Sequence, residues 1–240
     1  MEIGAFFDID GTLTRTSMME EHFRKLVQND IIDEDVWNLK VKPIYKDYKR
    51  RYTEYDLYLE TISNAYNKGL EGIPYDFIDF LAKKVIDDKA DVVYKYTKNR
   101  IRYHQERGHK VFFISGSPSF LVDKMARKYG VTDYKGTEFE VKDSLFTGSY
   151  KKMWDSENKR REMLRFKEAY NLNFEYSYAY GDTLGDTAMF EETGNPIAIN
   201  PSKSLLKYIQ GTPSLMNKIK IIVERKDVIY SIPPGVKFLT

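Results

Sequence analysis

The chain has 240 residues, and its 38 Lys and Arg against 36 Asp and Glu give a formal net charge of +2, which predicts no general attraction to nucleic acid or acidic membranes. It contains no cysteine, which excludes disulfides, zinc–thiolate sites and cysteine nucleophiles. No apolar run approaches the ~20 residues of a membrane span, and acidic residues interrupt the N-terminus as early as Glu2. We expect a cytoplasmic protein with one large domain, or with a core that carries an insertion.

The first element is a short apolar run at residues 3–7, which predicts a buried strand ended by Gly11-Thr12. Residues 16–88 differ in character, because they are charged, rich in Tyr and helical in period. We expect a helical insertion of several short helices there, with breaks near Asn29-Asp30, Lys42-Pro43, Lys68-Gly69 and Ile73-Pro74.

Strands and helices alternate in the rest of the chain. We expect helices at 91–107, 119–129, 156–170 and 205–209, strands at 110–114, 176–180 and 197–199, and a hairpin from 220–224 and 228–232. Residues 131–153 are typical of short strands with turns at Lys135-Gly136, Asp143-Ser144 and Thr147-Gly148. The alternation predicts an α/β core with a parallel sheet, formed by residues 1–15 and 89–240, and a smaller all-helical domain at 16–88.

Two acids, Asp8 and Asp10, come directly after the first strand and directly before a glycine. In a parallel α/β sheet, ligands bind beyond the carboxyl ends of the strands, so both side chains should reach the functional edge. Two carboxylates so close repel each other, and a divalent cation such as magnesium would resolve the conflict. The alternative is an ordinary strand-to-loop turn, where Asp and Gly are common.

A Ser-Gly pair, Ser115-Gly116, follows the strand at 110–114 and precedes the helix at 119–129. A hydroxyl, backbone N–H groups and a helix N-terminus together can form a phosphate cradle. The alternative is that Ser119 is an ordinary N-cap of that helix.

A second acidic pair, Asp182 and Asp186, follows the strand at 176–180, and its spacing puts both acids on one face of any helical turn. Taken alone, this pair fits a turn or helix cap equally well, and Lys159 alone fits a solvated helix face. The order along the chain is an acidic pair, a Ser, a Lys and a second acidic pair. Chance does not comfortably explain all four in this order.

These residues resemble the four motifs of the haloacid dehalogenase (HAD) superfamily: Asp8-Ile9-Asp10-Gly11-Thr12, Ser115, Lys159 and Gly181-Asp182 with Asp186. The resemblance covers residues 3–201 and is close to the phosphoserine-phosphatase-like branch, which carries a helical cap between its first two motifs. Segments 101–111, 136–148 and 195–201 also resemble that branch. The resemblance implies a Rossmann-like parallel sheet core and a cap domain at 16–88.

The resemblance also implies a role for each matching residue. Asp8 would attack phosphorus and form an aspartyl-phosphate. Asp10 would act as general acid and then as general base. The phosphoryl group would be held by Thr12, Ser115, Gly116 and Lys159, with Thr12 either near the phosphate or fixing the Asp10 loop.

Magnesium is the implied cofactor. Its implied ligands are the side chains of Asp8 and Asp182, the backbone carbonyl of Asp10, and Asp186 through water, although Asp186 could instead orient Lys159. An Asp at the first position favours phosphate chemistry over dehalogenation, because a metal must be bound as well.

We therefore predict a magnesium-dependent phosphomonoester hydrolase that acts on a small phosphorylated metabolite. Ser17 stands where phosphoserine phosphatases carry a Glu that binds the substrate amine, although Glu20 and Glu21 are close by. The leaving group is therefore open among an amino-alcohol, a polyol, a sugar and a lipid head group. The alternatives are a phosphotransferase or mutase on the same scaffold, and a non-catalytic phosphate-binding regulatory protein. The sequence assigns no oligomeric state.

Overall fold

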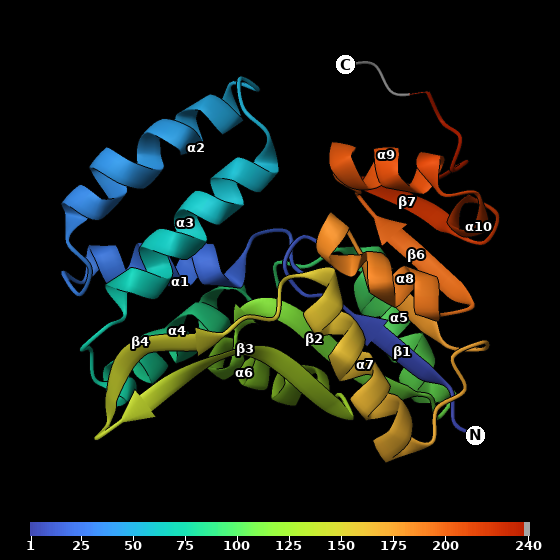
Figure 1. Cartoon of the computed structure of the whole chain (residues 1–240), viewed down its shortest axis with the longest axis horizontal. Helices are drawn as coiled ribbons and strands as arrows, with labels where there is room; N and C mark the ends of the chain where they lie inside the picture. Colours follow the sequence, from blue (N-terminus) through green and yellow to red (C-terminus); the bar gives the residue numbers. More distant parts are fainter. Residues whose placement is uncertain (238–240) are drawn as a thin grey trace.

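A central sheet of eight strands runs through the computed structural model, which describes residues 1–237 (Figure 1). Its order is β4-β3-β2-β1-β5-β6-β7-β8. The strands from β3 to β7 pair in parallel, and β4 and β8 pair antiparallel at the two edges. The predicted α/β fold with a parallel core is confirmed. The strands are β1 Gly4–Phe7, β2 Lys110–Pro118, β3 Asp133–Lys142, β4 Leu145–Lys151, β5 Tyr178–Gly181, β6 Asn195–Ile199, β7 Lys220–Arg225 and β8 Val228–Ile232.

The helices fall into an inserted group after β1 and a group that alternates with the later strands. The inserted helices are α1 Met18–Gln28, α2 Lys42–Lys49, α3 Tyr55–Gly69 and α4 Tyr75–Lys89, with a π-helical turn, η1, at Val36–Val41. The others are α5 Lys95–Glu106, α6 Ser119–Tyr129, α7 Ser156–Tyr170, α8 Thr187–Glu192, α9 Lys203–Gly211 and α10 Pro213–Met216, with a 3₁₀ turn, η2, at Leu184–Asp186. Within residues 1–237, no helix is long and apolar enough to cross a membrane.

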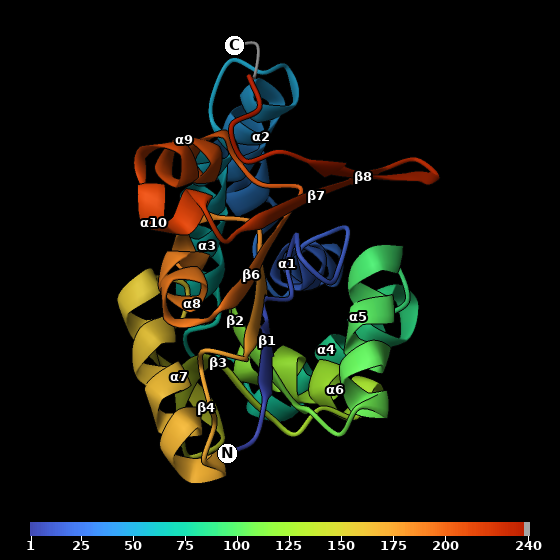
Figure 2. The same ribbon diagram turned by 90° about the vertical axis from the view of Figure 1, so that its right-hand side faces the viewer.

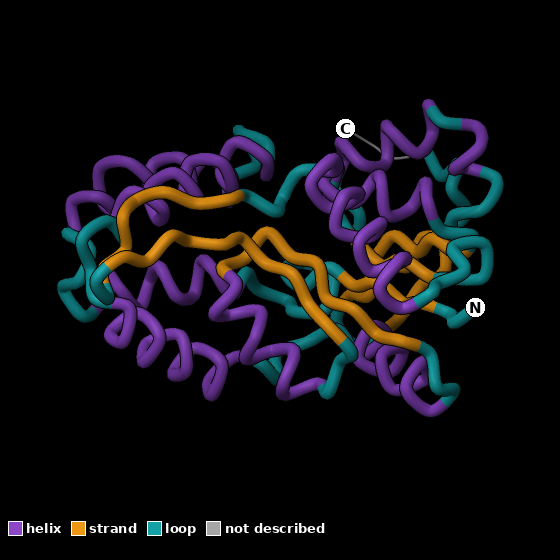
Figure 3. The backbone as a smooth tube through the Cα atoms, turned by 60° about the horizontal axis from the view of Figure 1, so that its bottom comes forward, coloured by secondary structure: helices purple, strands orange, loops and turns teal. Residues whose placement is uncertain are grey.

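Helices cover both faces of the sheet (Figure 3), and the central strand β1 is apolar for that reason. Side chains alternate between the faces of a strand. Phe6 points to the face covered by α7 and α8, where it stacks on Phe112 with ring centroids 5.1 Å apart. Ala5 and Phe7 point to the opposite face, which α5 and α6 cover (Figure 2).

The register of the parallel strands brings three strand ends to one edge of the sheet. Phe7 pairs with Phe113 of β2 and with Tyr180 of β5. The residues that follow these partners therefore emerge side by side, as expected at the carboxyl ends of parallel strands.

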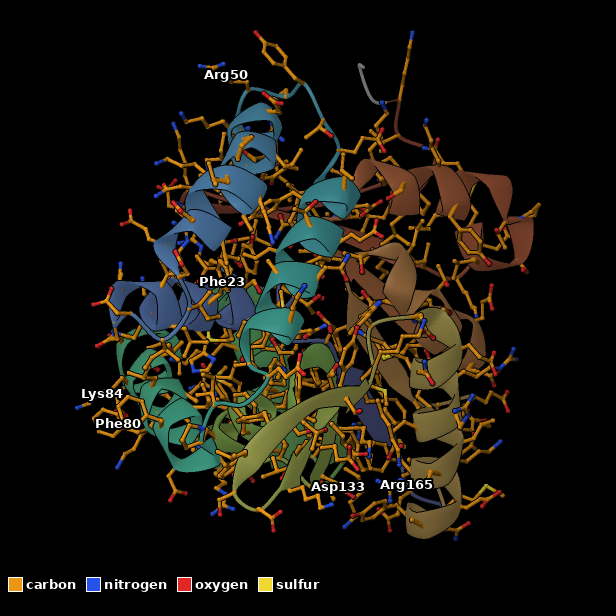
Figure 4. All side chains as sticks on the ribbon, turned by 60° about the vertical axis from the view of Figure 1, so that its left-hand side comes forward. Phe23, Arg50, Phe80, Lys84, Asp133 and Arg165 are labelled. Atoms are coloured by element: carbon orange, nitrogen blue, oxygen red, sulfur yellow. The ribbon has the colours of Figure 1, made fainter. Side chains whose placement is uncertain are left out.

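The inserted helices share one buried core with the face of the sheet that α5 and α6 cover. Phe23 of α1 is fully buried among them (Figure 4). The imidazole of His22 joins three of these helices, because its Nδ1 lies 2.7 Å from the Tyr66 hydroxyl and its Nε2 lies 3.2 Å from the carbonyl oxygen of Ile78. The hairpin of β3 and β4 extends from the sheet to this group, where the N–H of Gly72 donates to the carbonyl of Phe146 at 2.8 Å.

Two predictions about helix boundaries were wrong. The helix expected from residue 91 begins only at Lys95, because the chain before it is extended: Val93 pairs with Thr14, and the Tyr94 N–H donates to the carbonyl of Leu13 at 2.9 Å. The break expected at Lys42-Pro43 is absent, because η1 runs directly into α2. Proline is tolerated there because it sits in the first turn of α2.

Two predicted turns between residues 131 and 153 were also wrong. Lys135-Gly136 lies inside β3 and Thr147-Gly148 lies inside β4. Gly136 allows β3 to pack closely against the end of β2, because a Cβ at this position would lie 2.8 Å from the carbonyl oxygen of Ser117. The strands join at Asp143-Ser144, where both residues have positive φ, of 50° and 64°.

Candidate active site

The ends of β1 and β5 bring together three buried carboxylates. Asp8 follows β1, Asp182 follows β5, and Asp186 ends the short turn η2. One oxygen from each of the three carboxylates lies within 4.8 Å of the other two. Sequence predicted this set, and the structure brings all three members together.

Lys159 is the cation that faces these acids. It lies in the first turns of α7, which begins at the N-cap Asp155, whose side chain accepts the Asn158 N–H at 2.9 Å. The Lys159 Nζ donates to Asp8 Oδ1 at 2.7 Å and to Asp186 Oδ1 at 2.6 Å. Its side chain is 3% exposed, so the solvated helix face considered from sequence is excluded.

The electrostatics of this group favour a bound cation. Burial raises the pKa of Asp8 to about 7, and the Asp186 charge adds to this effect against the attraction of Lys159. Burial also raises the pKa of Asp182 well above its ordinary value, and the charges of Asp8 and Asp186 act in the same direction. Burial lowers the pKa of Lys159, but the Asp186 and Asp8 carboxylates outweigh it, so that Lys159 remains an ammonium ion. When the three carboxylates are ionised, the single ammonium of Lys159 leaves an excess of negative charge, which a bound cation would offset.

Two glycines allow the acids to approach so closely. Gly11 has a φ of 84°, and a Cβ there would lie 2.2 Å from Asp182 Oδ2. A Cβ on Gly181 would lie 2.4 Å from the Cγ of Asp186. Any larger residue at these positions would displace a carboxylate of the cluster.

Asp10 is not part of the cluster of three acids and is held by three donors. It accepts hydrogen bonds from the Ser117 hydroxyl at 2.5 Å, the Met18 N–H at 2.8 Å and the Ser17 hydroxyl at 3.2 Å. Burial nevertheless raises its pKa above the ordinary value. Ser117 was missed from sequence. The signal was its place two residues after Ser115, on the same side of an extended strand.

Three further residues, Ser115, Gly116 and Thr12, were predicted to hold the phosphoryl group. The buried Ser115 hydroxyl accepts the Ser117 N–H at 3.1 Å, and Gly116 packs against Trp154, where a Cβ would lie 2.8 Å from the Trp154 Cβ. Of the two places considered for the Thr12 hydroxyl, the Asp10 loop is not its partner, because the hydroxyl donates to Asp182 Oδ1 at 2.8 Å. The tight turn from Ile9, in which the Thr12 N–H bonds the Ile9 carbonyl at 3.3 Å, directs its side chain toward β5.

Asp186 uses both carboxylate oxygens. Oδ1 accepts from Lys159, and Oδ2 accepts the N–H groups of Asp182 at 2.9 Å and Thr183 at 3.0 Å. Of the two roles considered for it, this geometry favours the orientation of Lys159.

The set of donors fits a magnesium ion. All three acids offer hard oxygen ligands, and magnesium combines a few carboxylates with water and substrate phosphate. The group holds no sulfur or imidazole ligand of the kind that zinc prefers.

A family model described as haloacid dehalogenase-like hydrolase matches residues 5–191. The chain belongs to this family of hydrolases. The match covers both the acidic cluster and Lys159, and it confirms the predicted family.

Two curated relatives of this HAD hydrolase are phosphatases by name. It is 22% identical over 209 residues to a histidinol-phosphatase of Neisseria meningitidis, a match that covers 85% of this chain and 92% of the relative. It is 25% identical over 213 residues to a phosphoserine phosphatase of Mycobacterium tuberculosis, a match that covers 84% of this chain but 66% of the longer relative.

Solved structures share the fold of this HAD hydrolase. A substrate-bound phosphoserine phosphatase has a TM-score of 0.63 at 21% identity, with 95% of each chain covered. A phosphoserine phosphatase with an analogue of the phospho-aspartyl intermediate has a TM-score of 0.62 at 21% identity, with 94% of this chain and 95% of the other covered. These structures confirm the predicted fold. The family match and the curated relatives support the phosphoserine-phosphatase-like branch and an enzyme of the phosphatase class.

A cavity of about 490 Å³ opens onto the acids of this HAD hydrolase and is lined by Asp8, Asp10, Gly116, Ser117 and Lys159, among others. Its volume falls in the range of about 300–1,000 Å³ that is typical of sites for small molecules. A larger cavity of about 650 Å³ borders Gly11 and Asp182 but neither Asp8 nor Lys159. The smaller cavity is therefore the one that can present a substrate to Asp8.

A chain of hydrogen bonds lies behind the two strand ends. The Arg100 Nε donates to the Tyr180 hydroxyl at 3.0 Å, and the same hydroxyl lies 2.9 Å from His104 Nε2. The other ring nitrogen of His104, Nδ1, lies 2.9 Å from His109 Nδ1. The Tyr180 ring stacks on Phe7 with centroids 4.2 Å apart, so the chain supports both strands that carry the acids.

The buried imidazole of His104 predicts that the stability of the fold depends on pH. Burial, followed by the charge of Arg100, lowers the pKa of His104 from 6.5 to about 3. The unfolded protein therefore binds a proton at His104 at a higher pH than the folded protein does. The contribution of neutral His104 to the free energy of unfolding is complete above pH 6.5 and is lost as the pH falls from 6.5 toward 3. Urea unfolding measures the free energy of unfolding at pH 7 and at pH 5. Between these two values, His104→Gln should lose about 2 kcal/mol less of this free energy than wild type does. An equal loss in both proteins would show that His104 is not held neutral.

Proposed function

We propose that this HAD hydrolase is a magnesium-dependent phosphomonoester hydrolase that acts through an aspartyl-phosphate on Asp8. The observation that carries the proposal is the position of Asp8. Its carboxylate lines a cavity of small-molecule size, beside the Lys159 ammonium and within reach of two further carboxylates.

The first chemical step belongs to Asp8 and Asp10. An oxygen of Asp8 attacks phosphorus, and the bond from phosphorus to the ester oxygen breaks. Asp10 gives the leaving oxygen its proton, a role that its raised pKa supports. Asp10 then takes a proton from water as that water attacks phosphorus, which releases inorganic phosphate and restores Asp8.

The other residues hold the phosphoryl group and the cation. Lys159, with Ser115 and the backbone at Gly116, would hold the phosphoryl oxygens. The side chains of Asp8 and Asp182 and the backbone carbonyl of Asp10 would bind magnesium, and Asp186 would orient Lys159. Magnesium, when bound, supplies positive charge that offsets the repulsion between Asp8 and a dianionic ester.

We further propose that residues 16–88 act as a cap on a core made of residues 1–15 and 89–240. One face of α3 supports this division, because its residues line the same cavity as Asp8 and Asp10. The substrate would be a small phosphorylated metabolite, as the names of the phosphoserine and histidinol phosphatase relatives suggest. A cytoplasmic location is part of the same proposal, and the absence of cysteine agrees with it.

The protein should hydrolyse p-nitrophenyl phosphate when magnesium is present, and EDTA should stop the reaction. Without a cation, the negative charge of the acids repels the substrate dianion and keeps it from Asp8. Release of p-nitrophenol measures the rate, and excess magnesium added after EDTA should restore it. Full activity in EDTA would contradict the proposed cofactor.

A further inference from the structure

The last strand, β8, forms a free edge of the central sheet. Its outer side pairs with no strand among residues 1–237, and Figure 2 shows the tip of the β7–β8 hairpin standing clear of the other elements. The chain that follows β8 turns back to α9, where the Gln210 Nε2 donates to the carbonyl oxygens of Pro234 at 3.1 Å and Val236 at 2.8 Å. The backbone of β8 is therefore open to a further strand.

β8 lacks the features that usually protect an edge strand from pairing, which are charged residues, prolines and bulges. The edge strand at the other side of the sheet, β4, ends at Lys151 and pairs with β3 through a register shift. The five residues of β8, Val-Ile-Tyr-Ser-Ile, include no charge and no proline, and they pair with β7 without a shift. The first four are exposed, although three of these four are large apolar residues.

The hydrogen bonds of β7 show which backbone groups of β8 face outward. The Glu224 N–H donates to Asn200 Oδ1 at 2.8 Å, and the Ile222 carbonyl accepts the Asn200 N–H at 2.8 Å. Both residues of β7 therefore turn their backbone groups to the β6 side and away from β8. Their partners on β8 are Ile229 and Ser231. Because residues opposite each other in an antiparallel pair either face each other or both face away, Ile229 and Ser231 direct their N–H and C=O groups to the free edge.

A second copy of β8 matches these outward groups. When two copies lie antiparallel with Tyr230 on the two-fold axis, Ile229 of each copy lies opposite Ser231 of the other. Each such pair exchanges both of its N–H···O bonds, which satisfies every outward group of the two residues. On one face of the joined sheet, Tyr230 then packs against its symmetry mate, and Val228 packs against Ile232 of the second copy.

The residues that flank β8 select this register. A centre at Ser231 would place Ile229 opposite Pro233, which has no N–H to donate. A centre at Ile229 would place Ser231 opposite Asp227, which lies in the turn before β8. Among the registers that set outward residues against each other, the one centred on Tyr230 pairs both of them with residues of β8.

We infer that the free edge of β8 binds a second copy of this chain and joins the two sheets across a two-fold axis at Tyr230. The same surface is used by both copies, so the assembly closes at a dimer and does not grow into a fibre. One strand pair buries less than the ~1,200–2,000 Å² of stable complexes, so we expect a dissociation constant of about 10–100 μM. The inference does not rest on the proposed phosphatase activity, because no residue of β7 or β8 lines either of the two cavities described above.

Charged residues at the two outward positions test the pairing by sedimentation velocity. Wild type should sediment as a monomer at about 1 μM and increasingly as a dimer toward about 500 μM. Ile229→Lys/Ser231→Lys places lysines opposite lysines across the axis, and Ile229→Glu/Ser231→Glu places glutamates opposite glutamates. Like charges in these positions repel, so each double variant should remain a monomer. An equimolar mixture of the two should form dimers, because every lysine then lies opposite a glutamate.

Leu145→Lys/Ser149→Lys is the matched control, because both positions are exposed on the other edge strand, β4, and it should associate as wild type does. Recovery of the dimer on mixing also shows that both charged variants are folded. A wild type that stays monomeric at about 500 μM, or that grows beyond a dimer, would overturn the inference. Dimers of either charged variant alone, or none in their mixture, would overturn it equally.

Discussion

Replacement of Asp8 by Asn should lower kcat/KM on p-nitrophenyl phosphate by on the order of 10⁴-fold or more, as expected when the nucleophile of a covalent mechanism is lost. The neutral amide cannot form the acyl phosphate, although its Oδ1 can still accept a hydrogen bond from Lys159. Initial rates in saturating magnesium measure the effect.

The loss should not come from unfolding. Burial and the charges of Asp186 and Asp10 raise the pKa of Asp8 against the attraction of Lys159, so a neutral side chain relieves repulsion within the acidic group. Without magnesium, the melting temperature of Asp8→Asn should therefore equal or exceed that of wild type. Asp87→Asn, at an exposed position on α4, is the control and should keep full activity. If Asp8→Asn retained wild-type kcat/KM, Asp8 would not be the nucleophile.

Replacement of Lys159 by Met should have the second largest effect, and it should act on both activity and stability. The change removes a donor to the phosphoryl group, which should lower kcat by on the order of a hundredfold or more. It also leaves the buried Asp8 and Asp186 without their ammonium partner, which should lower the unfolding free energy by about 3–5 kcal/mol in EDTA.

Magnesium distinguishes the two effects of this substitution. A bound cation replaces part of the missing positive charge, so magnesium should recover more stability in Lys159→Met than in wild type. Urea unfolding with and without magnesium measures this difference, and Lys207→Met, at an exposed position on α9, serves as control. Equal stability of Lys159→Met and wild type in EDTA would show that the buried contacts of Lys159 contribute little.

Sequence predicted the parts of this fold in which local pattern and tertiary environment agree. The helices that begin at Ser119 and Ser156 were placed correctly at both ends. The first ends at Gly130, which has a left-handed φ of 60°, and the second begins at an Asp N-cap. The order of the motifs then placed Asp8, Lys159, Asp182 and Asp186 in one group, because parallel strands end at the same edge.

The missed features depend on contacts between distant parts of the chain. The start of α5 depends on the pairing of Tyr94 with Leu13, and Gly136 is a packing glycine whose neighbour, Ser117, lies on another strand. Likewise, the Thr12 hydroxyl turns to Asp182, which is 170 positions away. Local patterns carry no information about such partners. For the same reason, the residues of α3 that line the cavity were not recognised from sequence.

Chemical trapping of the acylated residue tests the central claim most directly. Magnesium-loaded enzyme is mixed with substrate, quenched in acid and treated with borohydride, which reduces an acyl phosphate but not a carboxylate. Peptide mass spectrometry should then find homoserine in place of Asp8, in amounts that depend on substrate and are absent from Asp8→Asn. Homoserine at Asp10, Asp182 or Asp186 while Asp8 stays intact would contradict the account.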